Sequence, residues 1–320
     1  MRLHLLVLDG VFDLGLAALT DTLTTANELA GSLPDAPSPI ELTLVGVRRR
    51  VRTAQGLTVP VAPAASARRP DVVLVPALGA KMPDALVARL ARADVADAVA
   101  AIRRWAGTGA TMGAACTGTF VLAESGLLDG QRATTSWWLA PTFRQRYPEV
   151  LLDESRMVVN SAGFTTAGAA MAHLDLALSV VRGRSPALAS LAARYLLAEE
   201  RGSQAAFVIP DHLAHADPLV ERFEGWARRS LARGFSLADA ARSVGASKRT
   251  LARRLRSVLG KTPLSYFQDL RVERAVHLLH TRSESVDQIA TRIGYANGVT
   301  LRTLLRRKLG RGVRELRSSA

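Results

Sequence analysis

A single cysteine stands where this sequence could most easily support nucleophilic chemistry. Cys116 lies in residues 114–118 (Ala-Ala-Cys-Thr-Gly), between an expected strand and an expected helix, which is the arrangement of a nucleophile elbow. A helix N-terminus would lower the pKa of the thiol and make it reactive. Hydrolysis by such a cysteine also needs a base, usually histidine, within hydrogen-bond reach. No histidine lies in a recognisable partner motif; the six are His4, His173, His212, His215, His277 and His280.

A second set of side chains suited to chemistry is basic and is confined to the C-terminal third. The 320 residues contain 42 Lys and Arg against 28 Asp and Glu, a net charge of +14. Residues 1–218 hold 20 basic and 20 acidic side chains, whereas residues 219–320 hold 22 and 8. A genome-wide bias towards arginine would have made both segments basic. The asymmetry therefore favours a C-terminal part that binds a polyanion, most often nucleic acid, over a merely solvated basic face.

The elements that must position these basic residues form an internal repeat. Residues 237–245 recur 49 positions later and residues 251–260 recur 50 positions later, with equivalent apolar residues and glycines. Each copy predicts a short amphipathic helix, a glycine turn, a polar cap (Ser247 or Asn297) and an arginine-rich second helix. This order is the helix-turn-helix pattern, whose second helix enters the major groove of DNA. Two copies in register argue against the alternative, a helical bundle that binds something else.

Residues 264–280 predict a helix that connects the two units. At 1.5 Å per residue it would be about 25 Å long. Successive major grooves on one face of DNA lie about 34 Å apart, so this connector suits two units bound side by side.

The base-reading residues of the first unit follow from which helix face is buried. With Leu251 and Leu255 in the core, Arg249 and Arg253 share the exposed face near the helix N-terminus. Either guanidinium can bind a guanine edge through two hydrogen bonds. The flanking side chains are expected to bind phosphates, which fixes register without reading sequence. They are Lys248, Thr250, Arg254 and Arg256.

The second unit offers weaker readers at the equivalent positions. Val299 and Thr303 face the bases there, with Arg302 beside them. This helix is expected mainly to clamp the DNA backbone through Arg302, Arg306 and Arg307. For any one of these arginines a simple solvated surface charge is the alternative.

Residues 1–200 predict a separate α/β domain. Apolar runs typical of buried strands lie at 3–8, 40–47, 71–76, 110–115 and 157–160, and helical periodicity lies between them at 15–29, 86–105, 118–124 and 169–181. The stretch 86–105 is expected to break near Asp94. This alternation favours a flavodoxin-like, mostly parallel sheet. A further helix is expected at 191–200 and a linker at 201–218. The all-helical DNA-binding domain then covers residues 219–320.

Composition also indicates the cellular environment of the protein. One cysteine cannot form an internal disulfide, which favours a reducing, cytoplasmic environment. No apolar run approaches the roughly 20 residues that span a bilayer, and no signal pattern precedes the first strand, so we expect no membrane partner. We also expect neither a cofactor nor a metal.

Short sequence motifs in the C-terminal third occur in the order that is typical of a known protein family. They occupy residues 236–241, 247–255, 260–263, 266, 271–275, 286–290 and 294–295. In this order they resemble the AraC/XylS family of bacterial transcription regulators, and the resemblance assigns Arg249 and Arg253 to base contact. Leu301 and Leu305 stand where that family often has Phe, and Val313 where it often has Pro. These apolar exchanges affect packing detail rather than the fold.

The N-terminal motifs follow a second known order. They occupy residues 8–10, 13–14, 26–28, 76–79, 114–123, 126–130, 133–135, 161–163 and 175–178. Together they resemble the DJ-1/PfpI branch of the class I glutamine-amidotransferase-like superfamily, and more narrowly the sensor domain of GlxA-like regulators of the AraC family. The resemblance implies dimerisation through this domain. GlxA-like sensors often carry histidine after the Ala-Thr-Thr run, where this sequence has Ser136, which cannot act as a base at neutral pH.

Because Ser136 replaces the expected base, we predict that the pocket is retained and that the hydrolytic activity is lost. The strand ends would form a crevice, with the expected lining Asp13, Gly79, Cys116, Thr117, Ser136 and Trp137. Trp137 and Trp138 point opposite ways if the chain is extended, which turns one of them to the crevice; a core or interface position for both is the alternative. An amine or amino-acid derivative would pair with Asp13 and lie on the Trp137 ring.

These expectations combine into a sequence-specific transcription regulator. It would bind double-stranded promoter DNA as a homodimer and respond to a small-molecule effector in a non-catalytic DJ-1/PfpI-like domain. Two alternatives stay open: a cysteine-dependent amidase or glyoxalase-like enzyme with an accessory domain, and a constitutive regulator whose N-terminal domain only dimerises. The reactivity of Cys116 separates the enzyme from the two regulators.

Overall fold

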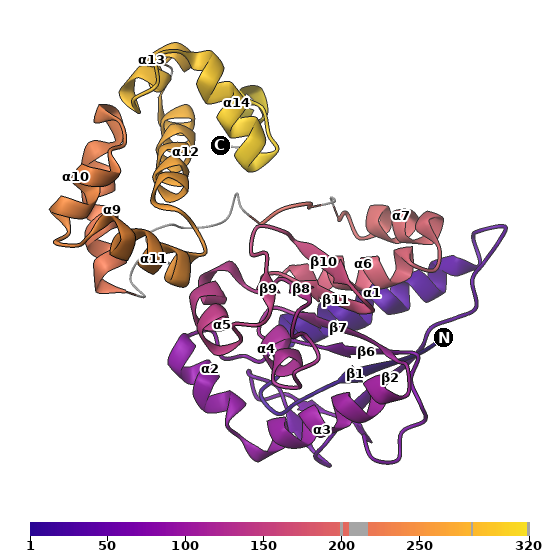
Figure 1. Ribbon diagram of the computed structural model, residues 1–320. Helices are drawn as coiled ribbons and strands as arrows, with labels where there is room; N and C mark the ends of the chain where they lie inside the picture. The colour runs from indigo at the N-terminus through magenta and orange to yellow at the C-terminus, as the bar shows by residue number, and fades with distance from the viewer. Residues whose placement is uncertain (199–200, 205–216, 283, 319–320) are drawn as a thin grey trace. The chain divides into compact units, whose positions relative to one another are not determined.

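The computed structural model describes residues 1–198, 201–204, 217–282 and 284–318. The chain divides into two compact units, Met1–Gln204 and Ala205–Ala320 (Figure 1). Most of the linker predicted at 201–218 lies outside the described residues, but residues 201–204 pack on the N-terminal unit. Within the described part of the chain, no helix is both long and apolar enough to cross a membrane.

A seven-stranded sheet forms the centre of the N-terminal unit, in the order β10-β11-β7-β6-β1-β2-β5. Its strands run parallel, except that β10 pairs antiparallel with β11. The predicted mostly parallel α/β sheet is thus confirmed. The strands are β1 (Arg2–Leu6), β2 (Glu41–Gly46), β5 (Ala62–Pro63), β6 (Val72–Val75), β7 (Thr111–Ala115), β10 (Val158–Ser161) and β11 (Phe164–Ala167). Two small pairs lie outside it: β3 (Val51–Arg52) with β4 (Thr58–Val59), and β8 (Arg132–Ala133) with β9 (Leu151–Leu152).

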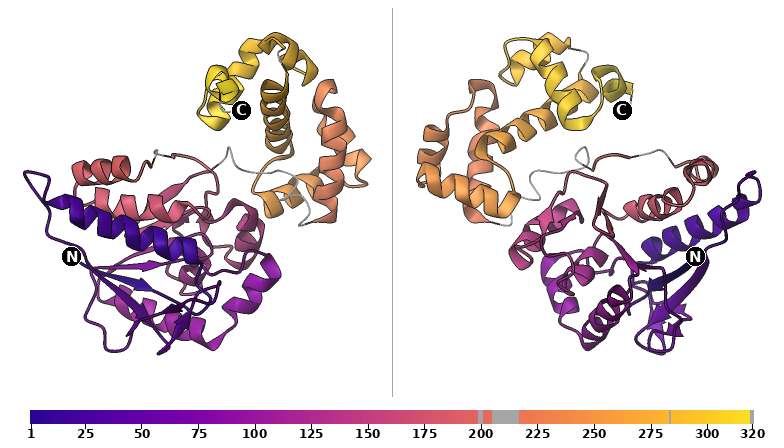
Figure 2. Two further views of the ribbon diagram at one scale, coloured as in Figure 1. Left: turned by 180° about the vertical axis from the view of Figure 1, so that it is seen from behind. Right: turned by 45° about the vertical axis from the view of Figure 1, so that its right-hand side comes forward.

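Helices cover both faces of this sheet because its central strands are apolar on both sides. In β1, Leu3 and Leu5 join one buried cluster and Leu6 joins the other. Figure 2 shows indigo α1 together with pink α6 and α7 on one side of the strands. The first layer consists of α1 (Asp13–Ala30), α6 (Ala172–Arg182) and α7 (Pro186–Tyr195). The opposite layer consists of α2 (Pro83–Leu90), α3 (Ala93–Gly107), α4 (Gly118–Ala123) and α5 (Ala140–Arg146).

One predicted break is present in this unit, and two elements differ from the sequence expectation. The break expected near Asp94 separates α2 from α3 at residues 91–92. The last helix begins at Pro186 rather than at 191, because the Ser185 side chain caps it by accepting the Leu188 amide. β11 was not predicted; its four residues are polar at Thr165 and Thr166, and pairing with β7 and β10 makes it a strand.

Helices make up the described part of the C-terminal unit, as predicted. Figure 1 shows α12 between the α10–α11 pair and the α13–α14 pair. The elements are α9 (Pro218–Ser230), η3 (Leu231–Arg233), α10 (Leu237–Ser243), α11 (Lys248–Leu259), α12 (Pro263–Thr281), α13 (Val286–Arg292), α14 (Gly298–Leu309) and α15 (Val313–Ser318).

Both turns of the repeat form as the sequence predicts. Gly245 and Gly294 have φ angles of 69° and 85°, in the left-handed region that other residues rarely adopt. Ser247 caps α11 by accepting the Thr250 amide, and Asn297 caps α14 in the same way. The chain therefore enters each second helix through an equivalent local geometry.

Arg271 of α12 joins the connecting helix to η3 and to the second repeat. Its buried guanidinium donates from Nε and Nη2 to the Leu231 carbonyl, at 3.1 and 2.7 Å. It also stacks on the rings of Phe267 and Tyr295, 4.8 and 4.6 Å from their centroids. A Cβ on Gly294 would lie 2.3 Å from Nη2. We call these five residues the Arg271 clamp; it ties the end of α9 to the turn of the second helix-turn-helix.

Candidate nucleic-acid interface and cysteine site

The exposed face of α11 carries the basic residues that the sequence placed there. Leu251 and Leu255 are fully buried, so the opposite face is turned to solvent. Arg249 and Arg253 are one helical turn apart and exposed, and within the described residues neither pairs with a carboxylate. Their guanidinium groups are thus available to an outside partner. The other predicted contacts of this helix are also exposed: Lys248, Thr250, Arg254 and Arg256.

Arg254 has an additional intramolecular role that the sequence did not indicate. Its Nε donates to Asp217 Oδ2 at 2.5 Å, while its side chain stays 55% exposed. Asp217 Oδ1 accepts the Leu219 and Val220 amides and so caps α9. Burial alone would raise the pKa of Asp217, but these hydrogen bonds and Arg254 together lower it. Arg254 therefore ties α11 to α9.

The second helix-turn-helix presents a similar face on α14. Leu301, Leu304 and Leu305 are buried. The predicted contacts Val299, Arg302, Thr303, Arg306 and Arg307 are all exposed. Four of them, all except Val299, line a hollow of about 680 Å³, which is completed by Gly312, Val313, Arg314 and Glu315.

Arg314 is a basic residue that the sequence reasoning left out. It lies in the first turn of α15 and lines this hollow together with Arg302, Arg306 and Arg307. Four arginines against one glutamate give the hollow a net positive charge, which suits phosphate oxygens. The only signal in the sequence was the continuing run of arginines beyond α14.

Cys116 occupies the turn that the sequence predicted, between the end of β7 and the start of α4. Its φ of 57° is in the left-handed region, which strains a non-glycine residue. The side chain is 5% exposed, and its Sγ lies 2.8 Å from Ser136 Oγ. The predicted elbow is therefore present, but its thiol is closed in by the neighbouring hydroxyl.

Burial of the thiol opposes the reactivity that its place before a helix suggested. Burial raises the pKa of Cys116, and hydrogen bonds to Ser136 and Thr117 and the charge of Lys81 only partly oppose this. The prediction of a lowered pKa is wrong, because desolvation of the buried thiol outweighs the contributions that lower its pKa.

No histidine in the described part of the chain bonds to Cys116. His173 is buried and uses both ring nitrogens for backbone contacts: Nε2 accepts the Ala77 amide at 3.0 Å, and Nδ1 donates to the Ala170 carbonyl at 2.6 Å. Burial lowers the pKa of His173 to about 4. His212 and His215 lie outside the described residues.

Two other residues of the predicted crevice, Asp13 and Gly79, meet at the turn formed by residues 54–55, and Thr117 bonds beside Gly79. Asp13 Oδ2 accepts the Gln55 amide at 3.1 Å, whereas its Oδ1 is buried without a hydrogen-bond partner among the described residues. A Cβ on Gly79 would lie 2.4 Å from Ala54 Cβ, so this turn packs directly on Gly79. Thr117 donates to the carbonyl of Leu78, next to Gly79, at 2.8 Å.

The paired tryptophans adopt a geometry that the sequence reasoning did not foresee. Residues 137–139 form a 3₁₀ turn, η1 (Trp137–Leu139), rather than an extended run. Trp137 is buried, and its ring meets that of Trp138 edge to face, 5.5 Å apart. Trp138 donates to the Lys81 carbonyl at 3.0 Å, and the Lys81 ammonium lies 5.4 Å from the Phe12 ring centre. Lys81, which the sequence reasoning missed, thus places a cation beside this site.

The fold and the sites define a two-part protein: an α/β unit with a buried cysteine at a strand end, followed by a double helix-turn-helix. Residues 1–183 match the DJ-1/PfpI family and residues 227–319 match a helix-turn-helix domain. The chain belongs to the DJ-1/PfpI family, and its C-terminal part is an AraC-type helix-turn-helix domain.

Known relatives match this chain over different shares of its length. The chain is 29% identical to the HTH-type transcriptional regulator ArgR of Pseudomonas aeruginosa over 222 residues, 68% of this chain and 67% of ArgR. It is 26% identical to the HTH-type transcriptional regulator GbdR of the same species over 91% of this chain and 77% of GbdR. For the HTH-type transcriptional regulator GlxA of Rhizobium meliloti the identity is 29%, over 61% of each chain.

A solved structure supports the fold of the N-terminal unit. An AraC family transcriptional regulator from Pseudomonas putida superposes with a TM-score of 0.51 at 18% identity, covering 61% of this chain and 98% of that one.

Proposed function

We propose that this protein is a sequence-specific DNA-binding transcription regulator. The observation that carries the proposal is the pair of exposed, arginine-rich helix faces, α11 and α14, that one compact unit presents. Arg249 and Arg253 read base edges in this proposal, and the apolar Val299 suits a thymine methyl group. The flanking basic residues bind phosphates, Arg254 with the nitrogens that Asp217 leaves free. The relatives named as transcriptional regulators support the same function.

The proposal includes a domain division and a cellular setting. In this proposal residues 1–200 form the sensor domain, residues 201–218 form the linker, and residues 219–320 bind double-stranded promoter DNA. The protein acts in the cytoplasm. We also propose a homodimer through the N-terminal unit, which the family resemblance supports. Sedimentation of the full chain at micromolar concentration tests it, and a monomer at that concentration would contradict it.

The DNA-binding proposal is tested by titrating the full chain onto promoter fragments of neighbouring genes over a salt series. Each two-bond arginine–guanine contact contributes about 1–3 kcal/mol of discrimination, so Arg249→Ala with Arg253→Ala should remove at least about tenfold of the sequence preference. Arg222→Ala with Arg242→Ala is the matched control, because both arginines are exposed on other helices of the same unit. Affinity should fall steeply with salt. Absence of sequence preference in the wild type would overturn the proposal.

We further infer that the N-terminal unit binds a small effector beside Cys116 without turning it over. Asp13 Oδ1, which has no partner in the part of the chain that the structure describes, supports a ligand that donates a hydrogen bond. The nearby Lys81 favours a zwitterion, such as an amino-acid derivative, over a simple amine. A thermal-shift screen of amino acids, betaines and amines tests this. Asp13→Asn should abolish the shift, whereas Asp21→Asn, an exposed change on the same helix, should keep it. A screen without any shift would favour a constitutive regulator.

The enzyme alternative, a cysteine-dependent amidase or glyoxalase-like activity, has less support. The Cys116 thiol is buried with a raised pKa, and Ser136 stands where a base is needed. Turnover that disappears in Cys116→Ser would restore this alternative.

A further inference from the structure

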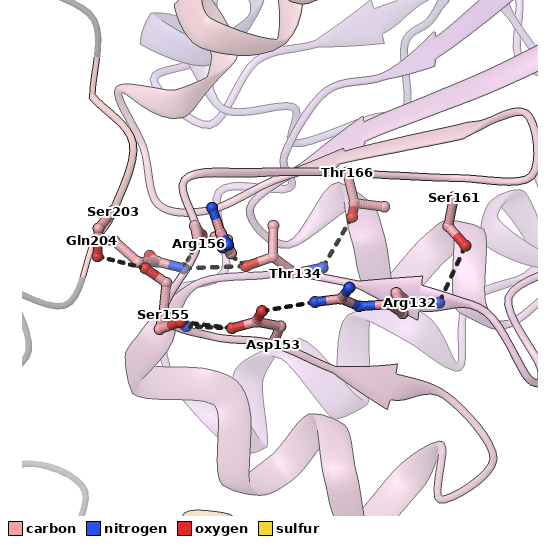
Figure 3. Close-up of polar contacts among 9 residues, drawn as sticks. All are labelled: Arg132, Thr134, Asp153, Ser155, Arg156, Ser161, Thr166, Ser203 and Gln204. Carbon is pink, nitrogen blue, oxygen red and sulfur yellow. Dashed lines mark hydrogen bonds and ion pairs between the residues drawn. The ribbon is translucent and has the colours of Figure 1, made fainter.

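The last described residues of the N-terminal unit, 201–204, are held to it by polar contacts; we call them the exit segment. Arg201 pairs with Asp175 at 2.5 Å, and the Met157 amide donates to the Gly202 carbonyl at 3.3 Å. The Ser155 carbonyl accepts both the Ser203 hydroxyl, at 2.7 Å, and the Gln204 amide, at 2.9 Å. Figure 3 shows Ser203 and Gln204 against Ser155 and Arg156. From this segment the chain continues towards the DNA-binding unit.

Gln204 anchors the exit segment by inserting its side chain into the unit. It is 1% exposed, and its Nε2 donates to the Thr135 carbonyl at 2.9 Å. The same nitrogen donates to Thr134 Oγ1 and to the Arg156 carbonyl, at 3.2 Å each (Figure 3). Because two of these acceptors are carbonyls, the amide nitrogen must face them. A Cβ on Gly168 would lie 2.7 Å from this amide, so the glycine leaves the room that Gln204 fills.

The other end of the same amide is poorly satisfied. Gln204 Oε1 is buried and has no hydrogen-bond partner among the described residues. A buried acceptor without a donor opposes docking, whereas the three contacts of Nε2 favour it. The unsatisfied oxygen therefore reduces the net gain of docking the Gln204 side chain, which favours an exit segment with a docked and an undocked state.

Thr135 connects this anchor to the cysteine site. Its Oγ1 donates to the Cys116 carbonyl at 2.7 Å, and its own carbonyl accepts the Gln204 amide. The next residue, Ser136, touches Cys116 Sγ. Cys116, Thr135 and Gln204 therefore form a chain of two hydrogen bonds that is buried throughout.

We propose that Gln204 is a positioning residue that couples the Cys116 site to the DNA-binding unit. A ligand bound beside Cys116 moves Thr135, this weakens the Gln204 anchor, and the exit segment undocks. The inference rests on the proposed function, since it concerns the effector site described above. A ligand shifts this equilibrium only if it binds the docked and undocked states with different affinity.

The experiment perturbs each link without needing the effector. Thr135→Val removes the hydroxyl that holds the Cys116 carbonyl, and Thr135→Ser restores it. Gln204→Glu keeps the shape of the side chain but turns a carboxylate oxygen towards two carbonyls. The control is Gln145→Glu, the same charge change at an exposed position of this unit. Hydrogen exchange of the Gln204 and Met157 amides reports docking, and the dissociation constant for a fragment that the wild type binds reports coupling.

We expect Thr135→Val and Gln204→Glu to speed exchange at both amides by about tenfold or more and to change DNA affinity by at least about threefold. Thr135→Ser and Gln145→Glu should match the wild type. Unchanged exchange, or faster exchange with unchanged DNA affinity, overturns the inference. If Gln204→Glu fails to fold, the pair of Thr135 variants decides alone. A wild type without sequence preference overturns the proposed function instead, so the two failures differ.

Discussion

The two turn glycines of the repeat offer a matched test of the Arg271 clamp. Gly245 and Gly294 hold equivalent places and both have positive φ. A Cβ on Gly245 would meet nothing within 4 Å, whereas one on Gly294 would lie 2.3 Å from Arg271 Nη2 and 2.5 Å from the Leu231 carbonyl oxygen. Atoms do not approach so closely, so Gly294→Ala must displace the guanidinium, and Gly245→Ala need not displace anything.

The difference in cost can be worked out from these contacts. Alanine in the left-handed region costs about 1–2 kcal/mol, which is the whole expected cost of Gly245→Ala. Gly294→Ala adds the loss of the charged hydrogen bonds from Arg271 to Leu231, about 1.5–3 kcal/mol. Loss of the stacking on Phe267 and Tyr295 adds about 1 kcal/mol more. We expect a total of about 3–6 kcal/mol for Gly294→Ala.

Native-state hydrogen exchange of the α12 and α13 amides measures this cost, because it reports opening of the C-terminal unit alone. Urea unfolding of the full chain gives an independent value. Arg271→Leu provides a second route to the same loss, and combining it with Gly294→Ala should be strongly non-additive. Equal costs for the two glycine variants would refute the clamp as a stabilising contact.

Three other predictions concern single side chains. Burial lowers the pKa of His173 from 6.5 to about 4, so the folded protein holds this imidazole neutral. The resulting contribution to the free energy of unfolding is complete above pH 6.5 and is lost as the pH falls towards 4. This loss is about 3 kcal/mol, so His173→Gln should flatten the pH profile of urea unfolding in that window. Iodoacetamide at pH 7 should label Cys116 only after urea unfolding; labelling of the folded chain at the rate of a free thiol would contradict its burial. Asp217→Ala should cost about 1–2 kcal/mol by uncapping α9, whereas Asp217→Asn should lose only the Arg254 ion pair, and equal losses would show that the cap contributes nothing.

Local signals explain why so much of the C-terminal unit was predictable. The turn glycines, the caps Ser247 and Asn297, and the apolar spacing of α10 and α13 each act within a few residues. Contacts between distant residues were not predictable in this way. Arg254 meets Asp217 37 positions away, and Arg271 meets Leu231 40 positions away.

At the cysteine site too, features set by adjacent residues were predictable, whereas features set by tertiary packing were not. The strand-to-helix turn at Cys116 follows from adjacent residues, and it is present. The ionisation of the thiol depends on how much of the folded unit covers it, and the sequence prediction was wrong there. Lys81 reaches the site through packing against Phe12, a contact that no spacing rule indicated. The DNA contacts and the effector pocket themselves stay predictions.

The Arg271 clamp has a consequence for the evolution of the DNA sites that such a protein recognises. α12 joins both helix-turn-helix units within one compact unit, and the clamp fixes the second of them to α12, so we expect the spacing between α11 and α14 to resist change when DNA binds. One inserted base pair rotates the far half of a binding site by about 34–36°. Single-base substitutions weaken such a site by degrees, whereas insertions and deletions between its halves abolish it. Binding sites in such promoters should therefore differ in base sequence while the spacing between their two halves stays constant.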